Sequence, residues 1–362
     1  MKIWIATGGT GGHVFPALAV ASELAHRGNH VIISSDGRTM NMVRKNRPIG
    51  AGVAFIWAAG VGAKSKLQQA VALMKIGVSA VALILRWAFF RPARVVAFGG
   101  YASVPAILAA RVWRIPTFLH EQNAAIGRAN RFALRWVDVL MTSFPTVSGI
   151  EKREAKGEKR ELKIIYTGLP VRKEFLIDAP RLSPLASRFS LLVTGGSLGA
   201  TILDEIVPAS VINLSASIKK KLFIVHQTRP DAVARLQQFY AANGIRANVL
   251  SFIHDMAGEM RAADLVIGRS GASTVVELQT IGRAAILVPL SINPDQPANA
   301  AAFAKTGGGF NVPQDKFTVK YLSATLTELF ENPARLAKMA EKARIPNNAV
   351  GKIVELALGI GH

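Results

Sequence analysis

Ile3-Trp4-Ile5-Ala6-Thr7-Gly8-Gly9-Thr10-Gly11-Gly12-His13 reads as a short apolar strand, a glycine-rich loop and the start of a helix. Two further glycine loops also follow apolar runs: Gly99-Gly100-Tyr101 after Val95–Phe98, and Gly195-Gly196-Ser197-Leu198-Gly199-Ala200 after Leu191–Val193. Glycine lets backbone N–H groups approach a ligand closely, and a helix N-terminus adds the positive end of a dipole. The repeated pattern predicts an α/β protein that holds phosphates or diphosphates at more than one place.

Length and composition narrow the class of protein. A chain of 362 residues, half of them hydrophobic, is long enough for two well-filled domains. Without cysteine it has no disulfide, thiolate metal site or cysteine nucleophile. The N-terminus lacks the longer apolar core of a signal peptide, so we expect the protein to be cytosolic.

The formal net charge of +21 suits three kinds of partner: nucleic acid, anionic lipid headgroups or phosphorylated substrates. The basic residues are spread along the chain, with no arginine-rich tail and no zinc-finger spacing. This distribution makes nucleic acid the least favoured of the three, and we expect none as a partner.

Strand-like runs rich in Val, Ile and Leu alternate with helical ones, which is typical of parallel strands covered on both faces. The expected strands are Ile3–Thr7, His30–Ser34, Arg94–Phe98, Thr117–His120, Val137–Thr142, Lys163–Tyr166, Ser190–Thr194, Leu222–His226, Asn248–Phe252, Leu265–Ile267 and Ala285–Pro289. The helix after the first loop is expected from about Pro16 to His26. We therefore predict two doubly wound, Rossmann-like domains, residues 1–165 and 166–344. The charged segment 151–161 is interpreted as a solvated loop or the approach to a linker.

An uncharged stretch, Ile76–Leu85, is followed by Trp87, Phe89 and Phe90 and by basic residues. Ten uncharged residues are too few to span a bilayer, which needs about 20. Two interpretations stay open: a buried core helix, or a surface that lies on anionic lipid, with Trp87 and Phe90 on the membrane face.

None of the loops is a Walker sequence or a Gly-x-Gly-x-x-Gly dinucleotide fingerprint, which removes support for kinases, P-loop ATPases and NAD-dependent enzymes. Taken together, the segments resemble the MurG family of bacterial N-acetylglucosaminyltransferases in order along nearly the whole chain. The matching segments are Gly8–Pro16, Gly99–Tyr101, His120–Asn123, Pro170–Arg172, Gly195–Ala200, His226–Gln227, Arg269–Glu277 and Gln296–Ala300.

The resemblance implies two Rossmann-like domains that face a cleft, as in GT-B glycosyltransferases. It implies an inverting transfer of N-acetylglucosamine from UDP-N-acetylglucosamine to an undecaprenyl-pyrophosphoryl N-acetylmuramyl peptide. The N-terminal domain would hold the acceptor and lean on the cytoplasmic face of the inner membrane as a peripheral protein. The C-terminal domain would hold the donor, and a C-terminal helix at about 345–362 would pack back on the first domain. Rival hypotheses are a similar transferase with another lipid or small-molecule acceptor, and a non-catalytic basic binding protein.

By the same resemblance, donor contacts fall on residues of several loops and helix starts. They are Thr10, Gly11, Gly12, Asn123, Arg172, Ser197, Ile253, Ala272, Ser273, Thr274, Val275, Val276, Glu277 and Gln296. No Asp-x-Asp pair is placed to hold a metal–diphosphate, so we expect no metal ion or cofactor, with UDP stabilised by backbone amides and Arg172.

Three acidic or basic side chains have competing interpretations. Glu277 either accepts the ribose hydroxyls or closes a capping box that begins at Thr274. His13, at a helix start where imidazolium is disfavoured, is a candidate general base or merely a hydrogen-bonding loop residue. Glu121 is the other candidate base, or a buried structural carboxylate.

Some positions depart from the family pattern. Leu169 stands where asparagine is usual before Pro-Val-Arg, and Leu198 stands where glutamine is usual in the third loop. Pro294-Asp295 precedes Gln296 where Asp-x-Gln is common, and the segment 60–64 resembles the acceptor loop only loosely. The loss of a side-chain amide at Leu198 predicts weaker donor affinity.

Overall fold

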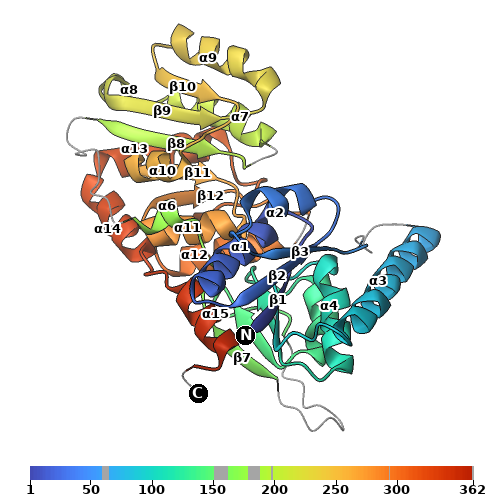
Figure 1. Ribbon diagram of the computed structural model, residues 1–362. Coiled ribbons are helices and arrows are strands. Elements are labelled where there is room, and N and C mark those ends of the chain that lie inside the picture. Colours follow the sequence, from blue (N-terminus) through green and yellow to red (C-terminus); the bar gives the residue numbers. More distant parts are fainter. Residues whose placement is uncertain (59–64, 151–161, 178–187, 197–198, 293, 361–362) are drawn as a thin grey trace. The chain divides into compact units, whose positions relative to one another are not determined.

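The computed structural model describes residues 1–58, 65–150, 162–177, 188–196, 199–292 and 294–360 (Figure 1). The chain divides into two compact units. Unit 1 comprises Met1–Arg172 and Asn347–His362, and unit 2 comprises Lys173–Pro346. Unit 1 therefore extends to Arg172 and not to residue 165 as expected, so Pro170-Val171-Arg172 belongs to unit 1.

Unit 1 contains a seven-stranded parallel sheet in the order β3-β2-β1-β4-β5-β6-β7. The strands are β1 (Lys2–Ala6), β2 (His30–Ser35), β3 (Gly52–Phe55), β4 (Arg94–Ala97), β5 (Thr117–Glu121), β6 (Val139–Thr142) and β7 (Lys163–Tyr166). From the central β1–β4 pair, successive strands are added outward: β2 and β3 beside β1, and β5, β6 and β7 beside β4. Ligands of such sheets bind beyond the carboxyl ends of the strands at this switch point.

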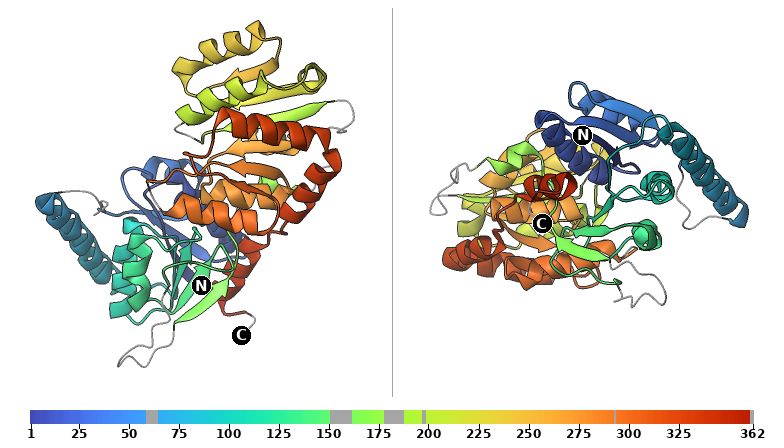
Figure 2. Two further views of the ribbon diagram at one scale, coloured as in Figure 1. Left: turned by 180° about the vertical axis from the view of Figure 1, so that it is seen from behind. Right: turned by 60° about the horizontal axis from the view of Figure 1, so that its bottom comes forward.

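Helices cover both faces of the unit 1 sheet, as the alternation along β1 shows. Ile3 and Ile5 belong to one core cluster, and Trp4 and Ala6 belong to another. The first cluster includes residues of α1 and of the C-terminal helix, and the second includes residues of α3 and α4 (Figures 1 and 2). The helices are α1 (Gly11–His26), α2 (Met40–Asn46), α3 (Lys66–Trp87), α4 (Val104–Val112), α5 (Arg128–Ala133) and α15 (Ala349–Leu358).

Unit 2 repeats the plan with a six-stranded parallel sheet in the order β10-β9-β8-β11-β12-β13, whose switch point is the β8–β11 pair. Its strands are β8 (Phe189–Thr194), β9 (Leu222–Gln227), β10 (Arg246–Leu250), β11 (Leu265–Gly268), β12 (Ala284–Leu287) and β13 (Gly309–Asn311). Its helices are α6 (Lys173–Leu176), α7 (Thr201–Val211), α8 (Ala216–Lys221), α9 (Val233–Ala242), α10 (Met256–Ala262), α11 (Ala272–Ile281), α12 (Asp295–Lys305), α13 (Val319–Glu331) and α14 (Pro333–Ala343).

The predicted fold class, two doubly wound α/β domains, is confirmed. Every predicted strand is present within two residues of its expected ends, and β3 and β13 were missed. The helix after the first loop begins at Gly11, so Pro16 lies inside it rather than near its start. The segments 60–64 and 151–161 lie outside the described residues.

Candidate active site

The first two glycine loops of unit 1 meet across its switch point. A Cβ atom on Gly8 would lie 2.6 Å from the Cβ of Ala102, and one on Gly100 would lie 3.3 Å from the carbonyl oxygen of Gly8. Gly100 also has a φ of 73°, which favours glycine. Any side chain at these positions would force the loops apart, so glycine is needed to bring both backbones to one place.

His13 lies in the first turn of α1, beside this contact. Its Nδ1 is 2.7 Å from the carbonyl oxygen of Phe98, at the end of β4. Because a carbonyl can only accept, Nδ1 donates and Nε2 carries the lone pair of the neutral ring. Burial lowers the pKa of His13 below its usual value and outweighs the Phe98 hydrogen bond and the charge of Asp36, which both raise it. His13 is therefore a neutral imidazole with Nε2 able to accept a proton near neutral pH.

Two further buried side chains, Gln122 and His120, contact Phe98. Gln122 donates to the Phe98 carbonyl over 3.5 Å, and the ring of His120 packs against the Phe98 ring. His120 donates from Nε2 to the Gly168 carbonyl over 2.9 Å, and burial lowers its pKa to about 4. The sequence singled out the tetrad that contains both residues, but it gave no sign of these contacts.

Glu121 is 1% exposed, and the chain's own donors hold both of its carboxylate oxygens. Oε1 accepts from the Asn123 amide N–H at 2.9 Å, and Oε2 accepts from the Gly127 amide N–H at 3.0 Å and the Asn130 side chain at 2.8 Å. This arrangement favours the structural interpretation of Glu121: it braces the loop that carries Asn123. Asn130 is a further brace that the sequence did not indicate.

In unit 2, the third glycine loop and the start of α11 flank the β8–β11 switch point. A Cβ on Gly195 would lie 2.4 Å from the Ala200 amide nitrogen, so the turn after β8 closes only around glycine. Ser197 and Leu198, a predicted contact and a departure from the family pattern, lie outside the described residues. The first backbone N–H groups of α11, from Ala272 onward, have no partner within the helix and can bind an anion.

The predicted capping box at Thr274 and Glu277 is wrong. The α11 helix begins at Ala272 with Gly271 as its N-cap, so Thr274 lies inside the first turn and cannot cap it. Glu277 is in the second turn and is 9% exposed. The capping explanation of this carboxylate therefore fails, and the ribose interpretation stays a proposal.

Gln296 stands in the first turn of α12, which follows β12. Its side-chain oxygen accepts from the Leu290 amide N–H at 2.9 Å, and its backbone carbonyl accepts from the Ser270 hydroxyl at 2.8 Å. Asn299 donates to the Ser270 carbonyl at 3.1 Å, which ties α12 to the turn before α11. These bonds orient the Gln296 amide group beside the helix start.

The remaining predicted site residues divide between the two units. Unit 1 holds Thr10, Gly11, Gly12, Asn123 and Arg172, and unit 2 holds Ile253, Ala272, Ser273, Thr274, Val275 and Val276. Ile253, Val275 and Val276 are buried. Leu169 is fully buried, and its carbonyl accepts from the Asn347 side chain at 3.0 Å. Leucine here fills a core position in place of the usual asparagine.

The prediction that Trp87, at the end of α3, lies on a membrane face is wrong. Trp87 is 0% exposed and packs edge-on against Trp4 at 5.3 Å between ring centres, so it is a core residue and its assignment to a membrane face is wrong. Phe90, by contrast, is 57% exposed. The helix has 22 residues, longer than the uncharged stretch suggested. It is long and apolar enough to cross a membrane by length and composition, with 33% of its most apolar window buried.

The exposed face of α3 and of the residues that follow it is mostly apolar. Its large exposed side chains are Leu67, Val71, Leu73, Met74, Val78, Val81, Leu85, Phe89 and Phe90. The opposite face contributes Ile76, Leu83 and Trp87 to the interior of unit 1. The two interpretations of this segment, core helix and exposed apolar surface, thus each describe one face.

Comparisons with known proteins agree with this geometry. Residues 3–142 match the glycosyltransferase family 28 N-terminal domain, and residues 190–355 match its C-terminal domain. A protein of Methylobacterium sp. strain 4-46 is 42% identical, covering 98% of this chain and 97% of its own length. It is named UDP-N-acetylglucosamine–N-acetylmuramyl-(pentapeptide) pyrophosphoryl-undecaprenol N-acetylglucosamine transferase. The chain belongs to the MurG family of glycosyltransferases.

Relatives from other genera and solved structures extend the comparison. A protein of the same name from Paramagnetospirillum magneticum is 38% identical over 99% of this chain and 96% of the relative. The crystal structure of Acinetobacter baumannii MurG has a TM-score of 0.80 and 31% identity, covering 99% of both chains. A UDP-GlcNAc 2-epimerase from Neisseria meningitidis shares the fold alone, with a TM-score of 0.66 at 15% identity.

Proposed function

We propose that this enzyme transfers N-acetylglucosamine from UDP-N-acetylglucosamine to undecaprenyl-pyrophosphoryl N-acetylmuramyl pentapeptide. Its family membership and the names of its relatives support this donor and acceptor. The observation that carries the chemistry is His13, a neutral imidazole with its tautomer set by Phe98 at the meeting point of two glycine loops.

In this proposal, unit 2 holds the donor. The N-termini of α11 and α12 and the third glycine loop supply N–H groups for the diphosphate. Glu277 accepts the ribose hydroxyls, and the Gln296 amide lies beside the helix starts. As UDP leaves, these N–H groups and Arg172 stabilise the negative charge that develops on it.

Unit 1 activates the acceptor. Nε2 of His13 accepts the proton of an N-acetylmuramyl hydroxyl as that oxygen attacks the anomeric carbon. The bond from the anomeric carbon to the UDP oxygen breaks as the new glycosidic bond forms, and a single displacement inverts the configuration. Glu121 acts on the chemistry only by holding the Asn123 loop. His120 stays neutral because its pKa is lowered to about 4, so it adds no positive charge next to His13 near neutral pH.

The exposed apolar face of α3 is proposed to rest on the membrane that contains the lipid-linked acceptor. Lys75 and Arg86 lie on the same helix, and cations beside an apolar face favour an anionic lipid surface. The buried stripe of α3 holds the helix to unit 1, so we favour a helix that lies on the bilayer over one that crosses it.

A transfer assay tests the proposal. Wild-type protein is given labelled UDP-N-acetylglucosamine and one of two kinds of acceptor: a soluble, short-chain lipid-linked N-acetylmuramyl pentapeptide, or unrelated lipids. Transfer to the muramyl-peptide acceptor alone supports the proposal. Donor binding with transfer only to another acceptor would contradict the proposed acceptor and leave the donor half intact.

A further inference from the structure

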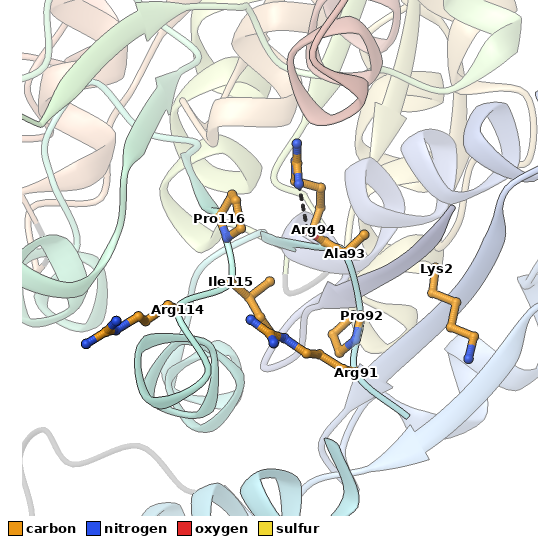
Figure 3. A pocket seen from close by; sticks show the side chains of 8 residues that line it. All are labelled: Lys2, Arg91, Pro92, Ala93, Arg94, Arg114, Ile115 and Pro116. Carbon is orange, nitrogen blue, oxygen red and sulfur yellow. Dashed lines mark hydrogen bonds between the residues drawn. The ribbon is translucent and has the colours of Figure 1, made fainter. Parts of the chain in front are cut away.

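Basic side chains lie at both edges of the two sheets, and the edge decides which ligands they can meet. At the amino ends of the unit 1 strands, a cavity of about 480 Å³ is lined by Lys2, Arg91, Arg94 and Arg114 (Figure 3). Ligands of doubly wound sheets bind at the opposite edge, beyond the carboxyl ends of the strands. Arg229 stands at that edge of unit 2, two residues after the end of β9.

The strand next to β9 is β8, which is followed by the third glycine loop and α7. The α7 helix begins at Thr201 after Ala200, and an alanine has no side-chain atom that can cap the first N–H groups. The acidic residue near its start, Asp204, is buried and so leaves the helix end uncovered. The start of α7 therefore has N–H groups for an anion, on the edge where Arg229 lies.

Buried side-chain hydrogen bonds fix the end of β9 to this loop. The Thr194 hydroxyl, at the end of β8, donates to Gln227 Oε1 at 2.7 Å, and its oxygen accepts from the Gly196 amide N–H at 3.3 Å. The Thr228 hydroxyl donates to the Asp204 carboxylate at 2.7 Å. Because these bonds are shielded from water, they hold the backbone before Arg229 in a fixed position beside the loop.

Arg229 also lies against the glycine loop directly. A Cβ atom on Gly199 would be 2.7 Å from Cγ of Arg229 and 3.5 Å from its Cδ. The φ of Gly199 is 69°, a value that favours glycine as well. The aliphatic part of Arg229 therefore crosses the loop at a point where any side chain on residue 199 would push it away.

The guanidinium of Arg229 is held only weakly by the protein. Its ion-pair partner is Asp231 at 3.8 Å, and the two side chains are 46% and 74% exposed. An ion pair so exposed contributes little, and a phosphate can replace the carboxylate. A guanidinium also presents its N–H donors in a planar fork that matches two phosphate oxygens. Arg229 thus combines a fixed backbone with a charge that a ligand can use.

We propose that Arg229 binds the diphosphate of the UDP-sugar, next to the N–H groups of the third glycine loop and α7. This inference rests on the proposed donor site and adds a cation of unit 2 to it. The guanidinium leaves Asp231 and donates to the phosphate oxygens when the donor binds. Its charge also stabilises UDP as the leaving group.

Titrations of the full chain with UDP, by calorimetry, and with the weaker ligand uridine, by NMR, test this contact. Three proteins are compared: wild type, Arg229→Gln, and the control Arg235→Gln, which removes the same charge from an exposed position of α9. We expect Arg229→Gln to weaken UDP binding roughly tenfold or more, the effect of losing hydrogen bonds to a charged group. Uridine has no phosphate, so its binding should be unchanged. The control should bind both ligands like wild type.

Equal affinity of Arg229→Gln and wild type for UDP would overturn the proposal. Equal weakening of UDP and uridine would overturn it as well, because Arg229 would then act on the base or on the shape of the loop. Arg229→Lys keeps the charge without the fork and should recover part of the lost affinity. If it binds UDP no better than Arg229→Gln, the charge at this position does not bind the diphosphate.

The two proposals fail in different ways. If the proposed donor site is wrong, wild type itself does not bind UDP. If only the Arg229 contact is wrong, wild type binds UDP and transfers the sugar, and Arg229→Gln matches it in both assays.

Discussion

Glutamate substitutions at neighbouring positions of the α3 segment should have different effects: some should weaken membrane binding, and others should unfold the protein. Leu85 and Phe89 are 65% and 85% exposed, whereas Trp87 is 0% exposed. Full burial of a Leu or Phe side chain is worth about 1.5–3 kcal/mol, so the exposed parts of Leu85 and Phe89 together supply about 2–4 kcal/mol to membrane binding. Leu85→Glu with Phe89→Glu should therefore weaken vesicle binding roughly 30- to 1000-fold, with a nearly unchanged melting temperature.

Trp87→Glu is the contrasting variant. Loss of a buried tryptophan costs about 3–5 kcal/mol, and a buried carboxylate beside Trp4 adds to that loss. This is a large part of the stability of a typical domain, so we expect unfolding or a strongly lowered melting temperature. Circular dichroism melts and sedimentation with anionic vesicles measure both effects. A folded Leu85→Glu, Phe89→Glu variant that sediments like wild type would refute the proposed membrane face.

Two further predictions concern individual buried residues. Glu277→Gln should weaken UDP-N-acetylglucosamine binding by about 1.5–3 kcal/mol without loss of a helix cap, because α11 begins at Ala272; unchanged donor affinity in a titration would contradict the ribose role. His120 has a folded-state pKa of about 4 against a usual 6.5, so the unfolded state binds the proton first and stability is lost as pH falls from 6.5 to 4. Between pH 6.5 and 4, the free energy of unfolding should fall by about 3 kcal/mol less in His120→Gln than in wild type. If it falls equally in both proteins, His120 does not have this lowered pKa.

Much of the fold could be predicted because buried parallel strands are short, nearly unbroken apolar runs, and the glycine loops mark the carboxyl ends of three of them. The two missed strands, β3 and β13, begin with glycine, are four and three residues long and lie at sheet edges, so their sequences resemble the loops next to them. The start of α1 was placed too late because Pro16 is typical of a first turn, whereas here it lies inside the helix.

The sequence motifs of the candidate site could be recognised, but the side-chain contacts and the exact helix starts could not. The Thr274–Glu277 spacing fits a capping box, but the helix start depends on Gly271 and on the turn after β11, which spacing cannot reveal. Trp87 and Phe90 look alike in sequence as aromatic residues near arginines. Only the packing of Trp87 on Trp4 separates the core residue from the exposed one.

The role of His13 is the central claim, and a single variant tests it most directly. His13→Asn can still donate to the Phe98 carbonyl but lacks the Nε2 lone pair. Turnover at saturating soluble acceptor should fall by about 10²–10⁴-fold, the usual contribution of a general base, while donor affinity stays at the wild-type value. A variant that keeps more than about a tenth of wild-type turnover, with the chemical step rate-limiting, would contradict the assignment of His13 as the base.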